Sequence, residues 1–140
     1  MSEKKLLFVY GSLRQGLGNH SFLRDENVSY LGNFITEPEW TMISLGGFPA
    51  LLEGGNTAIT GELYSVPEPV YRAIERLEGY PTFYNRKPLT TPLGEAEVYY
   101  IEEMERYGRN PEDYTVVEHG DWWKYLSGNS RGNYSYSHSL

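Results

Sequence analysis

An apolar run from Leu6 to Val9 ends abruptly in Tyr10 and Gly11, and this junction restricts the fold more than any other part of the sequence. A short apolar run bounded by turn residues is typical of a buried β-strand. Where such a strand stops in glycine and small polar residues, free backbone amides at the sheet edge can bind an anion or a developing oxyanion. We therefore expect a strand over residues 5–10, followed by a loop that either cradles a ligand or only reverses the chain.

The segments after this loop are mostly rich in β-forming residues and are separated by short turns of proline and glycine. They cover residues 28–37, 40–45 and 57–66, and two later ones cover 84–89 and 95–101. The last two flank Thr91-Pro92-Leu93-Gly94, which has proline and glycine where a hairpin turn favours them. Consecutive strands with short turns predict a curled sheet or a small barrel.

One segment has the pattern of an amphipathic helix. It opens with Pro67-Glu68-Pro69, and apolar Val70, Ile74 and Leu77 follow at spacings of four and three residues. We expect this helix to end at Gly79. Together with the strands, it predicts an α+β protein in which a small mixed barrel or curled sheet is flanked by short helices.

Two shorter helices are expected near the ends of the chain. Asn19 can cap one that reaches Leu23, and Asp121 can cap another through Trp122 and Leu126. Residues 102–114 are polar and interrupted by glycine and proline, so we assign them no element. The 140 residues suit one domain, which we place at 1–127, followed by a flexible Ser/Tyr-rich tail at 128–140.

Composition excludes several classes of function. The formal net charge of −7 argues against an extended nucleic-acid-binding face, which needs clustered Lys and Arg. The absence of cysteine excludes disulfides, thiolate nucleophiles and cysteine-based metal sites. The first apolar run is too short for a signal peptide, and no run approaches the length of a membrane span. We therefore expect a cytoplasmic protein without nucleic-acid or membrane partners.

Glu78 is the most suggestive single residue, because it lies at the end of the expected helix, just before Gly79. A carboxylate there faces the negative end of the helix dipole, which disfavours its charged form and raises its pKa. Enclosure by Tyr80, Phe83 and Tyr84 would desolvate it and shift the pKa in the same direction. Such a group suits proton transfer. The alternative is an ordinary solvated glutamate at a helix end.

Familiar catalytic and cofactor motifs are missing. The glycine loop lacks the Lys-Ser/Thr of a Walker A motif and the third glycine of a dinucleotide fingerprint. Ser12 does not lie in a Gly-x-Ser-x-Gly elbow. The three histidines, at positions 20, 119 and 138, show no metal-binding spacing. We therefore expect no metal site.

Five separated motifs, in order over residues 6–126, resemble the gamma-glutamylcyclotransferase-like family, and especially its gamma-glutamylamine cyclotransferase branch. These are Val9-Tyr10-Gly11-Ser12-Leu13, Gly47-Phe48-Pro49-Ala50-Leu51, Gly61-Glu62-Leu63-Tyr64, Leu77-Glu78-Gly79-Tyr80-Pro81 with Tyr84-x-Arg86, and Gly120-Asp121-Trp122 with Tyr125. The resemblance implies the same fold class that the strand and helix patterns predict.

The resemblance also implies an activity. The α-amine of a gamma-glutamyl group would attack its own γ-amide carbonyl, releasing 5-oxoproline and a free amine in an acyltransferase- or lyase-type cleavage. Glu78 would act first as general base and then as general acid. No metal or cofactor is implied.

The resemblance assigns supporting roles to other residues. The backbone of Tyr10, Gly11, Ser12 and Leu13 would hold the glutamyl group and stabilise the oxyanion. Tyr84 would hydrogen-bond the substrate. Structural support would come from two further charged residues, Arg86 and Asp121.

Two other functions remain open alternatives. The same cavity could bind gamma-glutamyl-like carboxylates without turnover, or tyrosines on a barrel could contact single-stranded nucleic acid, which the acidic charge disfavours. The leaving amine is not encoded in any motif of the sequence. Neither is the choice between monomer and homodimer.

Overall fold

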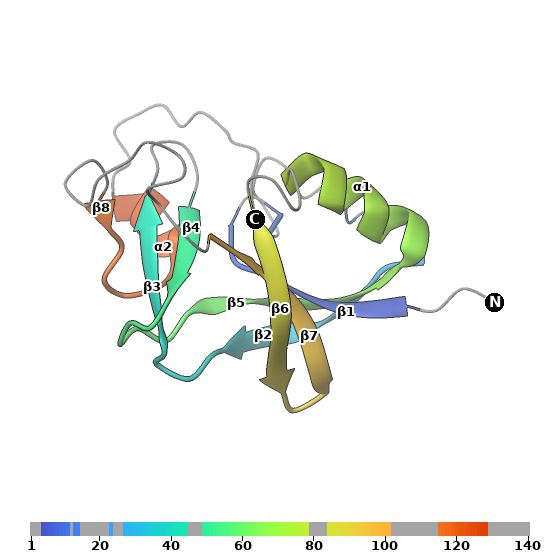
Figure 1. The fold of residues 1–140 in the computed structure, drawn as a ribbon, viewed down its shortest axis with the longest axis horizontal. Coiled ribbons are helices and arrows are strands. Elements are labelled where there is room, and N and C mark those ends of the chain that lie inside the picture. The colour runs from blue at the N-terminus through green and yellow to red at the C-terminus, as the bar shows by residue number, and fades with distance from the viewer. Residues whose placement is uncertain are drawn as a thin grey trace.

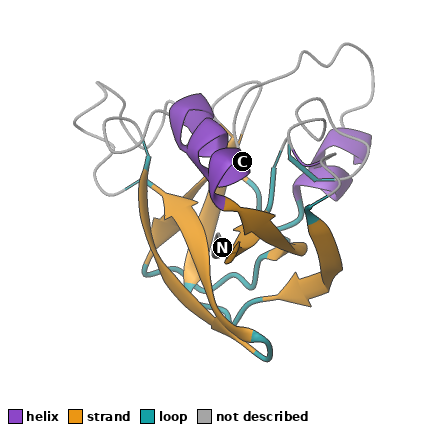
Figure 2. Ribbon diagram, turned by 90° about the vertical axis from the view of Figure 1, so that its right-hand side faces the viewer, coloured by secondary structure: helices purple, strands orange, loops and turns teal. Residues whose placement is uncertain are grey.

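The chain forms an α+β fold with two sheets and two short helices (Figures 1 and 2). The computed structural model describes residues 4–11, 13–14, 23, 27–44, 49–78, 84–101 and 115–128. Within these ranges, no helix is long and apolar enough to cross a membrane. The α+β class with a curled sheet and short helices is as the sequence predicts.

The larger sheet has five strands in the order β2-β5-β1-β7-β6. Their bounds are β1 Lys4–Val9, β2 Ser29–Ile35, β5 Thr60–Pro67, β6 Asn85–Thr91 and β7 Gly94–Tyr100. The smaller sheet has the order β4-β3-β8, with β3 Trp40–Ser44, β4 Pro49–Glu53 and β8 Thr115–Val116. The helices are α1 Glu68–Glu78 and α2 Trp122–Gly128.

Most of the expected elements are confirmed within a few residues. β4 and β8 are exceptions, since the sequence predicts no strand over either. β4 has the sequence Pro-Ala-Leu-Leu-Glu, which shows no apolar–polar alternation, and β8 has only two residues. Neither therefore has the periodicity by which a strand is recognised. The expected helix before Leu23, the segment 102–114 and the tail from 129 onward lie outside the described residues.

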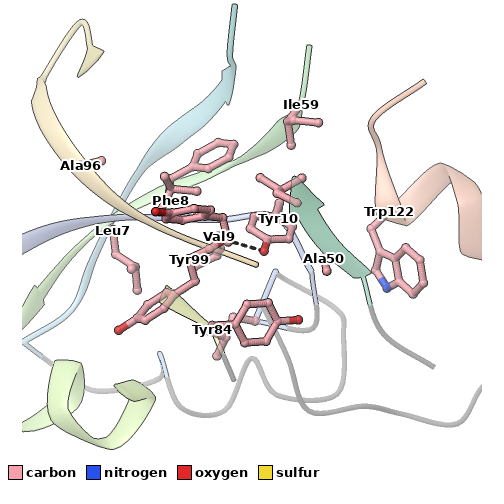
Figure 3. Packing of buried hydrophobic residues seen from close by; sticks show 14 of the residues in the cluster. Leu7, Phe8, Val9, Tyr10, Ala50, Ile59, Tyr84, Ala96, Tyr99 and Trp122 are labelled. Carbon is pink, nitrogen blue, oxygen red and sulfur yellow. Dashed lines mark hydrogen bonds between the residues drawn. The ribbon is translucent and has the colours of Figure 1, made fainter. Parts of the chain in front are cut away.

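β1 lies in the middle of the larger sheet, which explains its uniformly apolar end. It pairs antiparallel with β5 from Lys4↔Pro67 to Val9↔Glu62, and parallel with β7 at Leu7↔Glu97. Leu7, Phe8 and Val9 are fully buried. Figure 3 shows these side chains within the core. Successive side chains of a strand point to opposite faces of the sheet, so the burial of all three shows that both faces are covered at this end of β1.

α1 carries the chain back across the larger sheet. β5 ends at Pro67 beside Lys4, where β1 begins, and α1 starts at the next residue. Figure 1 shows α1 running back from this end of the sheet, and its Tyr71 and Ile74 are buried. The last residue of α1 is therefore carried toward the end at which β1 stops.

Arg86 holds α1 to the sheet. Its guanidinium forms an ion pair with Glu75 of α1 and lies 3.6 Å from Glu97 of β7, measured from Nε to Oε1. The same guanidinium lies 5.2 Å from the centre of the Tyr71 ring, and Lys5 Nζ lies at the same distance. These contacts combine charge pairing with cation–π attraction on one helix face.

The two sheets are joined by backbone and side-chain contacts. Ile101, directly after β7, donates its N–H to the carbonyl of Leu51 in β4 at 2.9 Å. Lys87 of β6 forms an ion pair with Glu53 of β4, and this hydrogen bond raises the pKa of Lys87 above its ordinary value. The described residues thus form two separate sheets that these contacts hold together.

The close approach of β5 to β1 requires glycine at position 61. A Cβ there would lie 2.4 Å from the carbonyl oxygen of Val9 and 2.6 Å from the Phe8 ring. We expect Gly61→Ala to lower the free energy of unfolding by about 1–3 kcal/mol, because backbone must shift to admit the methyl group. Equilibrium urea denaturation measures this, with Ser65→Ala on the same strand as control. Equal stabilities of the two variants would contradict the close approach.

Candidate functional site

The loop that follows β1 is held at both ends by buried side chains. Tyr10 is fully buried, and its hydroxyl donates to the carbonyl of Tyr99 at 2.7 Å, as Figure 3 shows. The N–H of Arg14 donates to the carbonyl of Gly11 at 3.0 Å and closes a tight turn, within which Leu13 is fully buried. Of the predicted loop residues, Ser12 lies outside the described part of the chain.

Glu78 is the final residue of α1. The helix packs against the larger sheet through buried Tyr71 and Ile74, and it ends at Glu78. Residues 79–83 lie outside the described part, and the predicted enclosure of Glu78 by Tyr80 and Phe83 falls on them.

Tyr84 joins the two sheets near the same end of the molecule. Its side chain is 1% exposed, and its hydroxyl donates to the carbonyl of Pro49, the first residue of β4, at 2.7 Å. The pairing of the next residue, Asn85, with Tyr100 places Tyr84 beside the end of β7. Tyr84 therefore holds the start of β4 close to the end of β7. Its contact with a substrate stays a prediction.

Arg14 forms a buried network of two ion pairs, which was not predicted from the sequence. Arg14 is 7% exposed, and its Nη1 lies 2.9 Å from Asp121 Oδ1 while its Nε lies 3.4 Å from Glu62 Oε2. The hydroxyl of Tyr64 donates to the other oxygen of Glu62 at 2.8 Å. One signal was available: a glutamate on an otherwise apolar strand needs a cationic partner, and Arg14 follows the loop directly.

Asp121 connects this network to α2. Its Oδ1 also accepts the N–H of Lys124 at 3.3 Å, so it caps the helix as its sequence position predicts. Gly120 before it has a φ of +68°, and its carbonyl accepts the N–H of Thr60 at 2.9 Å. The start of α2 is therefore held against β5 and against the loop after β1.

Arg86 contacts a different part of the structure from Arg14. It contacts Glu75, one turn before the end of α1, and so braces the helix that carries Glu78. Each arginine is paired with two carboxylates of the protein itself, which offset its positive charge. Backbone amides are the expected donors for an anionic ligand at the loop.

The described residues include no group of three or more His, Cys, Asp or Glu side chains that could hold a metal ion. One cavity, of about 620 Å³, lies between β2, β3 and β6 and reaches Pro92 of the hairpin turn. It contains none of the predicted site residues. The described residues of the predicted site lie near the ends of β1 and β7, and α1 runs back toward this end, so we take this region as the candidate site.

The buried hydrogen bond of Tyr84 makes a testable contribution to stability. We expect Tyr84→Phe to lower the free energy of unfolding by about 1–3 kcal/mol, because the carbonyl of Pro49 loses its buried donor. Tyr30→Phe is the matched control, since the Tyr30 hydroxyl donates to Asn33 in an exposed bond and Tyr30 is 45% exposed. Thermal or urea unfolding of both variants measures the difference. A loss no larger than that of Tyr30→Phe would contradict the structural role of Tyr84.

Comparison with known proteins identifies the family. The family model described as gamma-glutamyl cyclotransferase, AIG2-like, matches residues 7–124. A relative from Vibrio cholerae serotype O1 is 37% identical over 117 residues, which cover 84% of this chain and 94% of that protein. The gamma-glutamylaminecyclotransferase of Rattus norvegicus is 31% identical over 98 residues, covering 65% of this chain and 66% of that one.

Solved structures agree in fold. The solution structure of ytfP from Escherichia coli has a TM-score of 0.65 at 30% identity and covers 84% of this chain and 95% of its own. The crystal structure of an AIG2-like protein from Mus musculus has a TM-score of 0.71 at 23% identity, covering 99% of both chains. The match of the family model over most of the chain, with relatives of the same order of length, shows that this protein belongs to the gamma-glutamyl cyclotransferase, AIG2-like family.

Proposed function

We propose that this protein is a gamma-glutamylcyclotransferase, which converts a gamma-glutamyl amide into 5-oxoproline and a free amine. The matched family and the printed names of its relatives support this class of activity. The observation that supports the catalytic assignment most is the path of α1. It runs back over the sheet toward the end at which β1 stops, and Glu78 is its last residue.

The proposed reaction is an intramolecular transfer of the γ-acyl group. The α-amine attacks the γ-carbonyl carbon, forming a new C–N bond and a tetrahedral intermediate. Glu78 accepts the proton that the attacking amine loses. When the original amide C–N bond breaks, Glu78 returns this proton to the leaving nitrogen, so one carboxylate serves as base and then as acid.

Backbone amides of the loop after β1 would stabilise the intermediate. The hydrogen bond from Arg14 to Gly11 restrains the backbone at Gly11 and Leu13, and a restrained donor needs little reorganisation when negative charge develops on the carbonyl oxygen. Tyr84 would border the glutamyl group. Arg86 would hold α1, and Asp121 would hold the loop through Arg14.

Glu78→Gln tests the catalytic assignment. We expect this variant to fold normally and to lose about 10²- to 10⁴-fold in kcat, because the amide cannot transfer the proton. Release of 5-oxoproline from a gamma-glutamyl substrate is the measurement. Glu68→Gln, at the exposed start of the same helix, is the matched control and should retain full activity. Normal turnover by Glu78→Gln would remove Glu78 from the mechanism.

A substrate panel tests the activity itself. We expect the wild-type protein to release 5-oxoproline from at least one member of a set of gamma-glutamyl amino acids, dipeptides and alkylamines, because ring closure involves only the shared glutamyl half. If no member reacts while 5-oxoproline raises the melting temperature, the protein binds such ligands without turnover. That outcome would replace the enzymatic proposal with the binding alternative.

A further inference from the structure

Arg14 links three parts of the chain that lie far apart in sequence: the loop after β1, the strand β5 and the start of α2. Its guanidinium contacts Glu62, 48 residues away, and Asp121, 107 residues away. We propose that Arg14 is a positioning residue for the cyclotransferase reaction. By holding Gly11 and Leu13 in place, it would keep their backbone amides ready to stabilise the oxyanion. This inference rests on the proposed function.

Arg14 closes the turn through its backbone and anchors the turn through its side chain. The N–H of Arg14 closes the turn on Gly11 at 3.0 Å, and the side chain of Arg14 then holds that turn against β5 and α2. The other end of the loop is held by the hydrogen bond from Tyr10 to Tyr99. These two anchors restrain Gly11 and Leu13, which lie between them, and a restrained donor needs little reorganisation when negative charge develops.

The shape of the guanidinium matters as well as its charge. Arg14 donates from Nη1 to Asp121 and from Nε to Glu62, two directions that a planar fork satisfies together. A lysine ammonium supplies the same charge from a single point on a flexible stem. The contacts described for Arg14 go to carboxylates of the protein itself, so we assign Arg14 a role through the loop.

Removing Arg14 alone would leave two carboxylates close together, and the variant could fail to fold. Glu62 is 5% exposed, so its charge has little access to water. The decisive variant therefore combines Arg14→Met with Glu62→Gln. The glutamine removes one charge but keeps an acceptor for the hydroxyl of Tyr64. Arg14→Lys is the conservative variant.

The exposed pair Arg72 and Glu68 provides a matched control. Arg72 Nη2 lies 2.8 Å from Glu68 Oε2, and the two side chains are 60% and 55% exposed. Arg72→Met combined with Glu68→Gln makes the same chemical changes away from the loop. For all variants, kcat and KM for 5-oxoproline release, the melting temperature and hydrogen exchange of the peptide covering residues 10–14 are measured.

We expect the Arg14→Met/Glu62→Gln variant to remain folded, with kcat lowered about 100-fold, KM changed little and faster exchange in residues 10–14. Arg14→Lys should fall between this variant and the wild type, and the control pair should match the wild type. A folded double variant with wild-type kcat and loop exchange would overturn the proposal. If the double variant does not fold, wild-type kcat in folded Arg14→Lys overturns it equally. An inactive wild type would instead overturn the proposed function on which the inference rests.

Discussion

The arrangement of the molecule depends on β1 being buried between an antiparallel neighbour and a parallel one. Antiparallel pairing with β5 returns the chain to the start of β1, and a second crossing by α1 is then needed before β6 and β7 can follow. Parallel pairing with β7 brings the ends of β1 and β7 to the same side. One constraint thus brings the loop after β1 and the end of α1 toward one region.

Several buried polar groups in this region have partners from distant segments. Tyr10 and Tyr84 are fully or almost fully buried, and each donates its hydroxyl to a backbone carbonyl. Arg14 is paired with two carboxylates in the same way. An unpaired polar group would be costly at this depth, so each pairing also fixes the position of the backbone that carries it.

Local patterns in the sequence predict most of the elements because each is encoded within a few residues. The spacing of Val70, Ile74 and Leu77 predicts α1, and Asp121 caps α2 as expected. Local patterns could not locate the ion pairs of Arg14, since Glu62 and Asp121 lie 48 and 107 residues away from it in the sequence. The short strand β8 could not be predicted either, because its two residues form a strand only by pairing with β3.

Local sequence patterns are sufficient to predict the α+β class, the buried first strand, the glycine loop after it and the glutamate at the end of the amphipathic helix. Each follows from local backbone preference or hydrophobic periodicity, which act over a few residues. Three contacts, in contrast, are visible only in the folded chain: Arg14 joins the loop to β5 and α2, Tyr84 joins the two sheets, and Arg86 braces α1. These contacts depend on strand order and on the crossing of α1, and no local pattern specifies which distant side chain will meet another.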